Sequence, residues 1–349
     1  MILENSLALF TKSFNCTLPI IHYLCAMLRM RNIRYISLPR IWNIFRLRKF
    51  YRKAKHGKFD TEVPPPSFAS YEPTNICNLA CEMCPSGKGM LKRPRGIADM
   101  ELYKKFIIEN RRTLTNIILH FQGEPLMCKQ LGDMISYARQ NRIHTMFSTN
   151  GQLLAQNIDL IRNGRPDHII VSLDGLTNET YTQYRIGGKV QNVFDGLEKL
   201  SQLPAKERPY IELQFLVFSH NEHEIPDLQK LKKKYRIDKI TLKTAQIYDD
   251  SQVEFLPKDQ KYSRYAISDG KFKLKKTQEN HCKRLIFGTT ICFDGRVAPC
   301  CFDKDADYEF GNISSQNLTE IRNSEKFRNF VKQVFTQRNG IDICNNCTE

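Results

Sequence analysis

The chain has 349 residues, of which 41% are hydrophobic, and it carries a formal net charge of +16 at pH 7. This length allows about two domains with a sizeable core, and the hydrophobic content is ordinary for a soluble globular protein. Twelve cysteines are many for such a chain. Because several are clustered as CxxxCxxC or CxxC, we exclude a small secreted disulfide protein and favour metal ligation in a reducing compartment.

The first residues do not have the pattern of an export signal. The stretch "MILENSLALFTKSFN" lacks a basic segment before its apolar run and includes Glu4. The apolar piece "CTLPIIHYLCAML" is too short to cross a bilayer and contains Pro19 and His22. We therefore predict a cytoplasmic protein.

The basic charge is concentrated in the first 60 residues, which hold twelve Lys or Arg and two acidic residues, a net charge of +10. The segment "RIWNIFRLRKFYRKAK" has the pattern of a basic amphipathic helix. Its apolar side chains are Ile41, Ile44, Phe45, Leu47, Phe50 and Tyr51. Such a helix either packs on the protein body with its charges in water or lies peripherally on the anionic inner face of a membrane. Nucleic-acid binding is not expected, since no recognisable module accompanies the arm.

The proline-rich stretch "EVPPPS", residues 62–67, predicts a domain boundary. We predict a basic helical extension over residues 1–66, a core domain over 67–270 and a small cysteine-rich domain over 271–349.

From residue 68, short runs rich in β-branched and aromatic residues alternate with helical patterns such as "VQNVFDGLEKL". The expected strands are 68–74, 116–122, 143–149, 168–174, 211–219 and 238–244. Six strand–helix units imply an α/β fold with a parallel sheet, either doubly wound or curved into a barrel. In both arrangements the chemistry lies at the carboxyl ends of the strands.

Three cysteines, Cys77, Cys81 and Cys84, follow the first expected strand as CxxxCxxC, with no fourth cysteine nearby. A four-iron cluster held by three thiolates keeps one iron without a protein ligand. That iron is an open coordination position, like the one that catalytic zinc sites keep for water or substrate.

Further polar and glycine-rich motifs follow the next three expected strands. They are "QGEP" at 122–125, "STNG" at 148–151 and "SLDG" at 172–175, with Arg185 in "YRIGG" soon after. Together with the cysteines, these motifs predict one shared site at one rim of the sheet.

In these motifs, residues 68–245 resemble the radical S-adenosylmethionine (SAM) superfamily, whose signature is CxxxCxxC after the first strand of a partial (β/α)6 TIM-like barrel. The resemblance implies that Cys77, Cys81 and Cys84 bind a [4Fe–4S] cluster whose open iron binds SAM. It also implies that reductive cleavage of SAM gives a 5′-deoxyadenosyl radical, which abstracts hydrogen from a substrate C–H bond. An electron donor such as flavodoxin or ferredoxin is then required.

The resemblance also assigns the SAM-binding residues. It implies that Gly123 and Glu124 hold the SAM amino group and that Ser148 and Asn150 line the ribose.

Ser172 and Asp174 would lie on the neighbouring strand, and Arg185 would pair with the SAM carboxylate through two hydrogen bonds. One residue departs from the family pattern: Met83 stands before the third cysteine, where an aromatic residue is common. Its thioether can still pack on adenine.

A second set of cysteines lies near the C-terminal end, in "HCKRLIFGTTICFDGRVAPCC" and "DICNNC". Together with "GNI" and "LTEIRNS", these stretches resemble the SPASM/Twitch extension of some radical SAM enzymes. The resemblance implies one auxiliary [4Fe–4S] cluster, as in the Twitch form. Its ligands would be Cys282, Cys300, Cys344 and Cys347.

Two alternatives remain open at this second set. Cys301 can replace Cys300, because spacing alone does not separate adjacent residues, and a structural zinc can occupy the same four thiols. The other cysteines are predicted to be buried core thiols. They are Cys16, Cys25, Cys128 and Cys292.

A closed auxiliary cluster suits electron transfer, so we predict an oxidoreductase that dehydrogenates a sugar, cyclitol or similar metabolite. One alternative is a maturase that modifies a peptide or protein. Another is a non-catalytic iron–sulfur or zinc scaffold, against which the intact "QGEP", "STNG" and Arg185 argue. The reaction needs a general base. His120 and Asp249 lie near strand ends, but the sequence does not select either, and His120 is better explained as a hydrogen-bonded strand residue.

Overall fold

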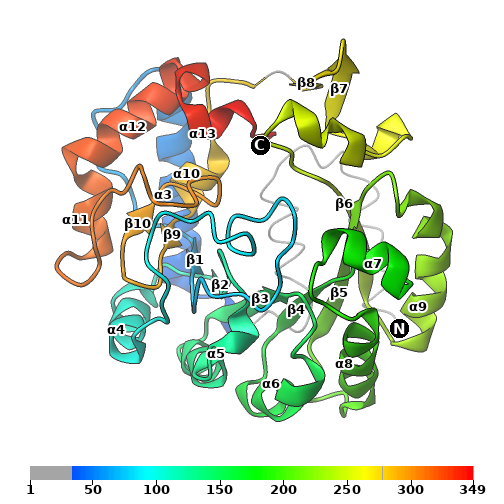
Figure 1. Cartoon of the computed structure of the whole chain (residues 1–349). Coiled ribbons are helices and arrows are strands. Elements are labelled where there is room, and N and C mark those ends of the chain that lie inside the picture. Colours follow the sequence, from blue (N-terminus) through cyan, green and yellow to red (C-terminus); the bar gives the residue numbers. More distant parts are fainter. Residues whose placement is uncertain (1–33, 277, 349) are drawn as a thin grey trace, which may run out of the picture.

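The computed structural model describes residues 34–276 and 278–348. Six parallel strands lie side by side in chain order, and all six predicted strands are confirmed (Figure 1). They are β1 (Phe68–Tyr71), β2 (Asn116–Ile118), β3 (His144–Thr149), β4 (His168–Ser172), β5 (Tyr210–Val217) and β6 (Lys239–Thr244).

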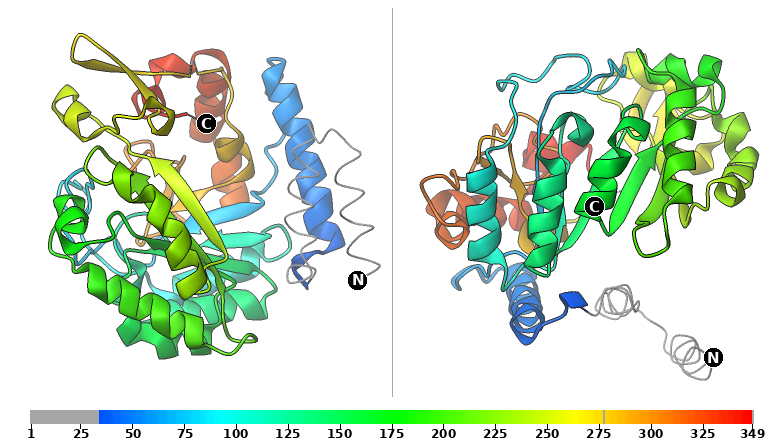
Figure 2. Two further views of the ribbon diagram at one scale, coloured as in Figure 1. Left: turned by 90° about the vertical axis from the view of Figure 1, so that its right-hand side faces the viewer. Right: turned by 90° about the horizontal axis from the view of Figure 1, so that it is seen from below.

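The helices that follow these strands cover the outer face of a curved sheet (Figures 1 and 2). They are α4 (Met100–Asn110), α5 (Leu131–Gln140), α6 (Ile158–Gly164), α7 (Asn178–Tyr184), α8 (Val190–Gln202) and α9 (Leu228–Lys234). Strand β3 shows the two faces clearly, since Thr145 and Phe147 are buried while Met146 and Ser148 are only half-buried. The arrangement is therefore the partial (β/α)6 barrel, and the doubly wound alternative is wrong.

The C-terminal part joins the same sheet beside β1. Strand β9 (Thr290–Ile291) pairs parallel with β1, and β10 (Val297–Ala298) pairs antiparallel with β9. Four helices complete this part. They are α10 (Lys283–Phe287), α11 (Leu318–Asn323), α12 (Glu325–Thr336) and α13 (Asp342–Asn345). One continuous hydrophobic core runs from the barrel into these helices.

A β-hairpin lies between the barrel and the C-terminal part. Strands β7 (Tyr265–Ser268) and β8 (Lys271–Leu274) are joined through Asp269 and Gly270, whose φ angles are 51° and 72°. Two consecutive left-handed residues are typical of the tight hairpin turn that matches strand twist. The boundary predicted at residue 270 falls in this turn, and both predicted domain boundaries stay predictions.

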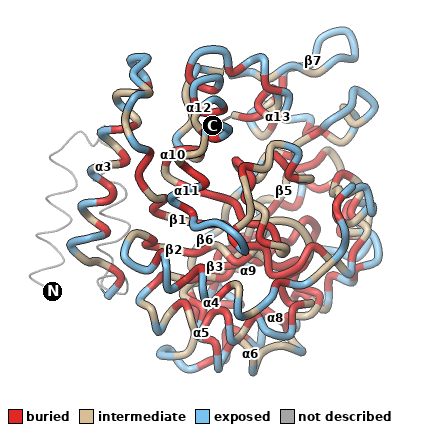
Figure 3. The backbone as a smooth tube through the Cα atoms, turned by 90° about the vertical axis from the view of Figure 1, so that its left-hand side faces the viewer, coloured by how far each residue is buried: buried red, intermediate tan, exposed pale blue. Residues whose placement is uncertain are grey.

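Before the barrel, helix α3 (Leu38–Lys55) packs on the C-terminal part, where it contacts α10 and α12. Its buried residues include Ile44, Leu47 and Phe50, so one side of the tube in Figure 3 is buried and the other exposed. One face of this helix packs on the protein body, as one alternative predicted, and a membrane contact of the other face stays a prediction. The predicted apolar stripe is wrong at Phe45, which faces solvent and is 52% exposed.

Two predictions about the N-terminal arm lie outside the described residues. Those on Cys16 and Cys25 and on the helical character of residues 1–33 cannot be compared with the structure. Cys128 and Cys292 are fully buried core thiols, as predicted. No helix within the described ranges is both long and apolar enough to span a bilayer.

The fully buried side chain of Arg322 joins the proline linker to the C-terminal part. Its guanidinium donates to the carbonyls of Pro64 at 3.0 Å, Ile286 at 2.6 Å and Gly288 at 3.1 Å. It also lies 4.9 Å from the ring centroid of Phe327. A planar cation with five donors can satisfy several carbonyls at once, which no other side chain does as well.

Replacing Arg322 by Met should lower the free energy of unfolding by at least about 3 kcal/mol, because each buried carbonyl left without a donor costs roughly 1–3 kcal/mol. Urea unfolding followed by circular dichroism measures the change. The control is Lys332→Met, since Lys332 is exposed on α12. Equal stability of the two variants would show that the Arg322 contacts do not hold the linker.

Candidate functional site

A buried ion pair closes the loop that carries the first three cysteines. The carboxylate of Glu72, just after β1, accepts hydrogen bonds from both terminal nitrogens of Arg93. Both side chains are almost completely buried. The same carboxylate accepts from the backbone N–H groups of Gln122 and Phe293, and Arg93 Nε donates to the carbonyl of Lys304 at 2.7 Å. The sequence analysis missed this pair, which fixes both ends of the cysteine loop.

Within this loop the three predicted cysteines lie together in one partly buried cluster with Met83. The backbone N–H of Cys84 donates to the carbonyl of Cys81 at 3.1 Å, so a tight turn presents the second and third thiols. Gly87 supports this turn from behind. A Cβ atom there would lie 2.9 Å from the backbone nitrogen of Cys81, so only glycine fits without a shift of the loop.

Burial disfavours the thiolate form of these cysteines, and neighbouring N–H groups favour it. Burial raises the pKa of the Cys81 thiol to about 11, and the nearby Arg185 opposes this rise. Burial likewise raises the pKa of Cys77. Two N–H groups face these sulfurs, Asn150 Nδ2 at 3.8 Å from Cys77 Sγ and Arg185 Nη1 at 3.9 Å from Cys81 Sγ. Such donors stabilise the thiolates that an iron–sulfur cluster requires, so these residues fit the implied cluster.

Arg185 lies between the second thiol and a buried carboxylate. Its Nε is 2.6 Å from Asp174 Oδ2, and Asp174 Oδ1 accepts from the backbone N–H of Leu216 at 2.7 Å. Asp174 is fully buried, and the Arg185 side chain is nearly so. The two predicted residues are thus brought together, and the pair connects the ends of β4 and β5 to Cys81. The role of Arg185 toward a SAM carboxylate stays a prediction.

The "QGEP" loop lies against the start of the cysteine loop. Gly123 has a φ of 73°, and a Cβ there would be 2.6 Å from the carbonyl oxygen of Thr74, so this close approach requires glycine. The Glu124 carboxylate is buried and accepts from Thr149 Oγ1 and the Asn150 N–H, both at 2.7 Å. In this structure Glu124 therefore holds the end of β3. Its role toward the SAM amino group stays a prediction.

The remaining predicted SAM residues lie on the same rim. Ser148 in β3 pairs with Ile170 in β4, which places Ser172 two residues further along β4 and on the same face. Asn150 Nδ2 donates to Asn78 Oδ1 at 2.8 Å and so contacts the cysteine loop. The structure brings these three residues to the carboxyl ends of adjacent strands. Their contacts with SAM stay predictions.

Neither proposed base is well placed for the task. The His120 ring accepts a hydrogen bond from the Ser148 N–H at 3.1 Å, and burial lowers its pKa to about 4. Asp249 is exposed and caps the short 3₁₀ helix at Asp250–Phe255, where the hydrogen bond from Ser251 lowers its pKa. His120 is therefore a hydrogen-bonded residue at the strand end, and Asp249 is a cap.

The C-terminal thiols gather around a buried arginine that the sequence analysis missed. Arg338 Nη2 lies 3.3 Å from Cys347 Sγ, and Nη1 donates to the carbonyl of His281 at 2.8 Å. Burial raises the pKa of Cys344, and the hydrogen bond from Arg338 opposes this rise. The backbone N–H of Leu285 faces Cys282 Sγ at 3.4 Å. A cation and an N–H group directed at sulfur fit the ligands of a negatively charged cluster.

Cys300 is the predicted fourth member of this set. Burial raises the pKa of Cys300 strongly, and the charges of Cys301, Cys282 and Cys344 add to this rise. The choice between Cys300 and Cys301 stays a prediction.

No three His, Cys, Asp or Glu side chains in residues 34–276 and 278–348 converge closely enough to hold a metal ion. Ligands of a single zinc all meet at one point, whereas a four-iron cluster binds each thiolate at a different iron. The fit of the two thiol sets to clusters therefore rests on the N–H groups and arginines around them.

Comparison with known proteins identifies both parts of the chain. A family model described as the radical SAM superfamily matches residues 71–240, and one described as SPASM, an iron–sulfur cluster-binding domain, matches residues 282–348. The second match overturns the zinc alternative for the C-terminal thiols. GTP 3′,8-cyclase of Clostridium botulinum (strain Okra / Type B1) is 25% identical over 281 residues, which are 70% of this chain and 84% of that protein.

Solved structures share the fold at low sequence identity. BtrN in complex with AdoMet and 2-DOIA is 20% identical with a TM-score of 0.51, over 81% of this chain and 93% of BtrN. Streptococcus suis SuiB bound to precursor peptide SuiA is 12% identical with a TM-score of 0.59, over 80% and 69%. Native anSMEcpe with bound AdoMet is 18% identical with a TM-score of 0.58, over 77% and 84%.

Two thiol sets predict about eight irons per chain after anaerobic reconstitution. Replacing Cys77, Cys81 and Cys84 together by Ala should leave about four, and so should Cys300→Ser alone. Cys301→Ser is the matched control and should keep all of them. Iron analysis and electron paramagnetic resonance measure the outcome. Loss of a cluster in Cys301→Ser but not in Cys300→Ser would contradict the assignment of the ligand.

Replacing Arg93 by Met should destabilise the cysteine loop by about 3–5 kcal/mol, because it leaves the Glu72 carboxylate buried without its partner. Iron should then pass faster to a chelator from the reconstituted enzyme. Lys92→Met, at the exposed neighbouring residue, is the control. The double variant Glu72→Gln/Arg93→Met should recover part of the loss. Equal iron release from Arg93→Met and wild type would contradict a role for the pair in holding the loop.

Proposed function

We propose that this chain, which belongs to the radical SAM superfamily and carries a C-terminal SPASM domain, is an oxidoreductase that dehydrogenates a sugar, cyclitol or similar metabolite. Membership in these families brings three cofactors: a SAM-binding [4Fe–4S] cluster, SAM and an auxiliary [4Fe–4S] cluster. When bound, they supply a 5′-deoxyadenosyl radical and a second centre for electron transfer. The chain is therefore an enzyme, and its substrate and reaction type are the proposal.

The observation that carries the proposal is the set of four C-terminal thiols beside the buried Arg338. Four protein ligands leave no iron open to a substrate, so electron transfer is the role that best fits this set. In a dehydrogenation, the substrate loses a hydrogen atom to the radical and then one electron and one proton. The electron needs an acceptor, and the proton needs a base.

The residues at the barrel rim would position SAM for this reaction. Arg185 is oriented by a hydrogen bond to Asp174, and Glu124 accepts two hydrogen bonds from the end of β3, so buried contacts restrain both the guanidinium and the strand end. A rim held by buried hydrogen bonds loses little entropy when a ligand binds. It also keeps the reacting atoms at fixed distances.

The share of each similar structure that this chain covers favours a metabolite over a peptide as the substrate. The chain spans 93% of BtrN, which was solved with AdoMet and 2-DOIA, but 69% of SuiB bound to the peptide SuiA. About a third of SuiB therefore has no counterpart here. A peptide-modifying maturase is the second candidate, since the chain spans 86% of anSMEcpe solved with AdoMet and the Cp18Cys peptide.

We also propose a reduced flavodoxin or ferredoxin as the electron donor. The enzyme would act in the cytoplasm and touch the membrane only peripherally, through its basic N-terminal arm.

The reduced enzyme should cleave SAM to 5′-deoxyadenosine, and Cys81→Ala should abolish this activity. Arg185→Ala should weaken SAM binding by roughly 1.5–3 kcal/mol, the range for a hydrogen bond to a charged group. Arg112→Ala, at an exposed position after α4, should bind SAM like wild type. Equilibrium dialysis measures binding, and chromatography measures the nucleoside. Unchanged SAM affinity in Arg185→Ala would show that this residue has another role.

The substrate class is tested by adding sugars and cyclitols, or peptides, to the reduced enzyme with SAM. We expect a sugar or cyclitol to increase 5′-deoxyadenosine formation and to lose two mass units. Stimulation by peptides alone would favour the maturase instead.

A further inference from the structure

The outward face of α3 carries a continuous row of exposed side chains at helical spacing. We call this row the outer stripe; it consists of Leu38, Trp42, Phe45, Lys49, Arg52 and His56. The intervals are alternately four and three residues, so all six lie on one side of the helix. Opposite them, Ile44, Leu47 and Phe50 are buried against the protein body. The outer stripe is therefore not needed for packing this helix.

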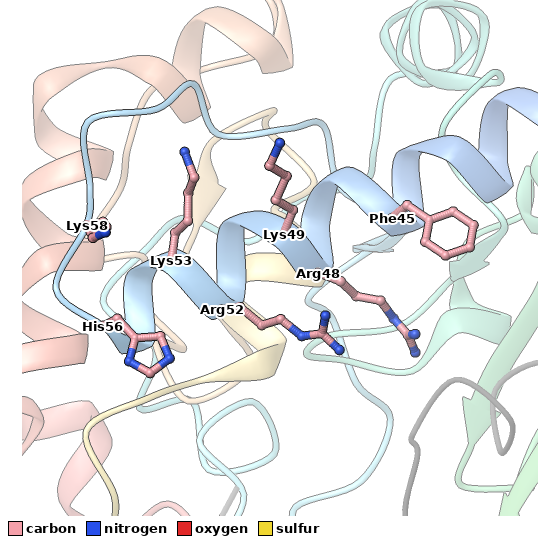
Figure 4. A pocket seen from close by; sticks show the side chains of 7 residues that line it. All are labelled: Phe45, Arg48, Lys49, Arg52, Lys53, His56 and Lys58. Atoms are coloured by element: carbon pink, nitrogen blue, oxygen red, sulfur yellow. The ribbon is translucent and has the colours of Figure 1, made fainter.

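The two halves of the outer stripe differ in chemistry. Its first half is apolar, with Leu38 82% exposed, Trp42 67% and Phe45 52%. Its second half is basic and continues into a groove of about 570 Å³, lined by Phe45 and by six basic side chains between residues 48 and 58. In the view of Figure 4, the side chains of Arg48 and Arg52 extend below the helix and those of Lys49 and Lys53 above it, so the two stripe residues Lys49 and Arg52 splay apart at their tips. An exposed tryptophan and phenylalanine beside a basic cluster need a partner that is both apolar and anionic.

The charge on helix α3 is of one sign. Helix α3 contains seven Lys or Arg and no acidic residue. Burial among neighbouring charges lowers the pKa of Arg48, and the charge of Arg52 adds to this effect. Arg46, beside the outer stripe, makes an ion pair with Glu62 at 3.8 Å between two exposed groups. An external anionic surface stabilises such a group of neighbouring cations, because it neutralises several of their charges at once.

We propose that the outer stripe docks the enzyme on an anionic lipid surface. Leu38, Trp42 and Phe45 enter the headgroup region, and Lys49 and Arg52 contact the lipid phosphates. Tryptophan favours the membrane–water interface because its ring is amphipathic, and basic side chains are attracted to anionic headgroups. This inference rests on the peripheral membrane contact in the proposed function, but not on the reaction, and it gives that contact a defined surface.

An acidic redox protein is the main alternative occupant. Tyr51, on the inner side of α3, contacts the ring of His281 at 3.0 Å, next to the cluster ligand Cys282. A redox partner on this helix would therefore be close to the auxiliary thiols. The observations favour lipid, because Leu38 and Trp42 are apolar, are 82% and 67% exposed, and lie on α3 outside the basic groove. A highly acidic partner would not bury these apolar side chains.

The test uses the reconstituted full chain with vesicles of phosphatidylcholine, alone or mixed with phosphatidylglycerol. Trp42 is the only tryptophan, so its fluorescence reports directly on the outer stripe. We expect co-sedimentation with the mixed vesicles, a blue shift of the emission, and weakening of both by salt. Lys49→Gln/Arg52→Gln should lower the affinity roughly thirtyfold, since each basic side chain adds about 1 kcal/mol at an anionic surface. Leu38→Asn/Phe45→Asn should remove the blue shift.

The matched control is Lys271→Gln/Lys273→Gln, which removes two exposed charges from strand β8 and should bind vesicles like wild type. Equal loss of vesicle binding in this control would overturn the proposal, because binding would then depend only on the net charge of the protein and not on the outer stripe. Negligible binding with unchanged Trp42 emission would also overturn it. So would a complex with reduced flavodoxin, or self-association, that the Lys49/Arg52 variant abolishes while vesicles fail to bind.

SAM cleavage is measured in the same samples to separate this inference from the proposed reaction. The outer-stripe variants should keep wild-type 5′-deoxyadenosine formation in the absence of vesicles. Vesicle binding by a chain that does not cleave SAM would leave the docking surface supported and the reaction refuted. Normal SAM cleavage without vesicle binding would refute the docking surface and leave the proposed reaction supported.

Discussion

The ion pair between Glu72 and Arg93 connects the parts of the molecule on which the chemistry depends. It closes a loop that begins at the end of β1 and holds all three cysteines of the barrel. Through the N–H groups of Gln122 and Phe293 the same carboxylate holds the loop after β2 and the segment after β9. A buried pair contributes little net stability, since desolvation offsets most of the attraction. The pair instead favours this one arrangement of the loop, because an arrangement that separated the pair would leave Glu72 or Arg93 buried without its partner, at a large cost in free energy.

Parallel strand order supplies the second constraint. Because β1 to β6 run side by side in chain order, residues that end consecutive strands meet at one rim. Hydrogen bonds then link the ends in sequence: Glu124 holds Asn150, Asn150 contacts Asn78, and Arg185 joins Asp174 to Cys81. The cysteine loop is thus held by the strand ends beside it. The order of the strands in the sheet therefore brings the site residues together, and the loops alone would not do so.

The sequence predicted those features that depend on local pattern, and it failed where a contact joins distant residues. Runs of β-branched residues identified all six strands, and strand ends with cysteine or glycine identified the rim. Arg93 and Arg338 gave no signal, because an arginine in a loop looks the same whether it is exposed or buried. Phe45 was assigned to the wrong side of α3, since the helix has two faces with apolar residues and periodicity does not say which one packs. Spacing also left Cys300 and Cys301 equivalent, because adjacent residues differ by only one position in the chain.

Each thiol set has one arginine directed at a cysteine sulfur. Arg185 faces Cys81, and its charge is shared with the buried carboxylate of Asp174. Arg338 faces Cys347 and also donates to the carbonyl of His281. Hydrogen bonds to sulfur stabilise negative charge on an iron–sulfur cluster. In the dehydrogenation that we propose for this chain, Arg338 would therefore favour transfer of the electron from the substrate radical to the C-terminal set.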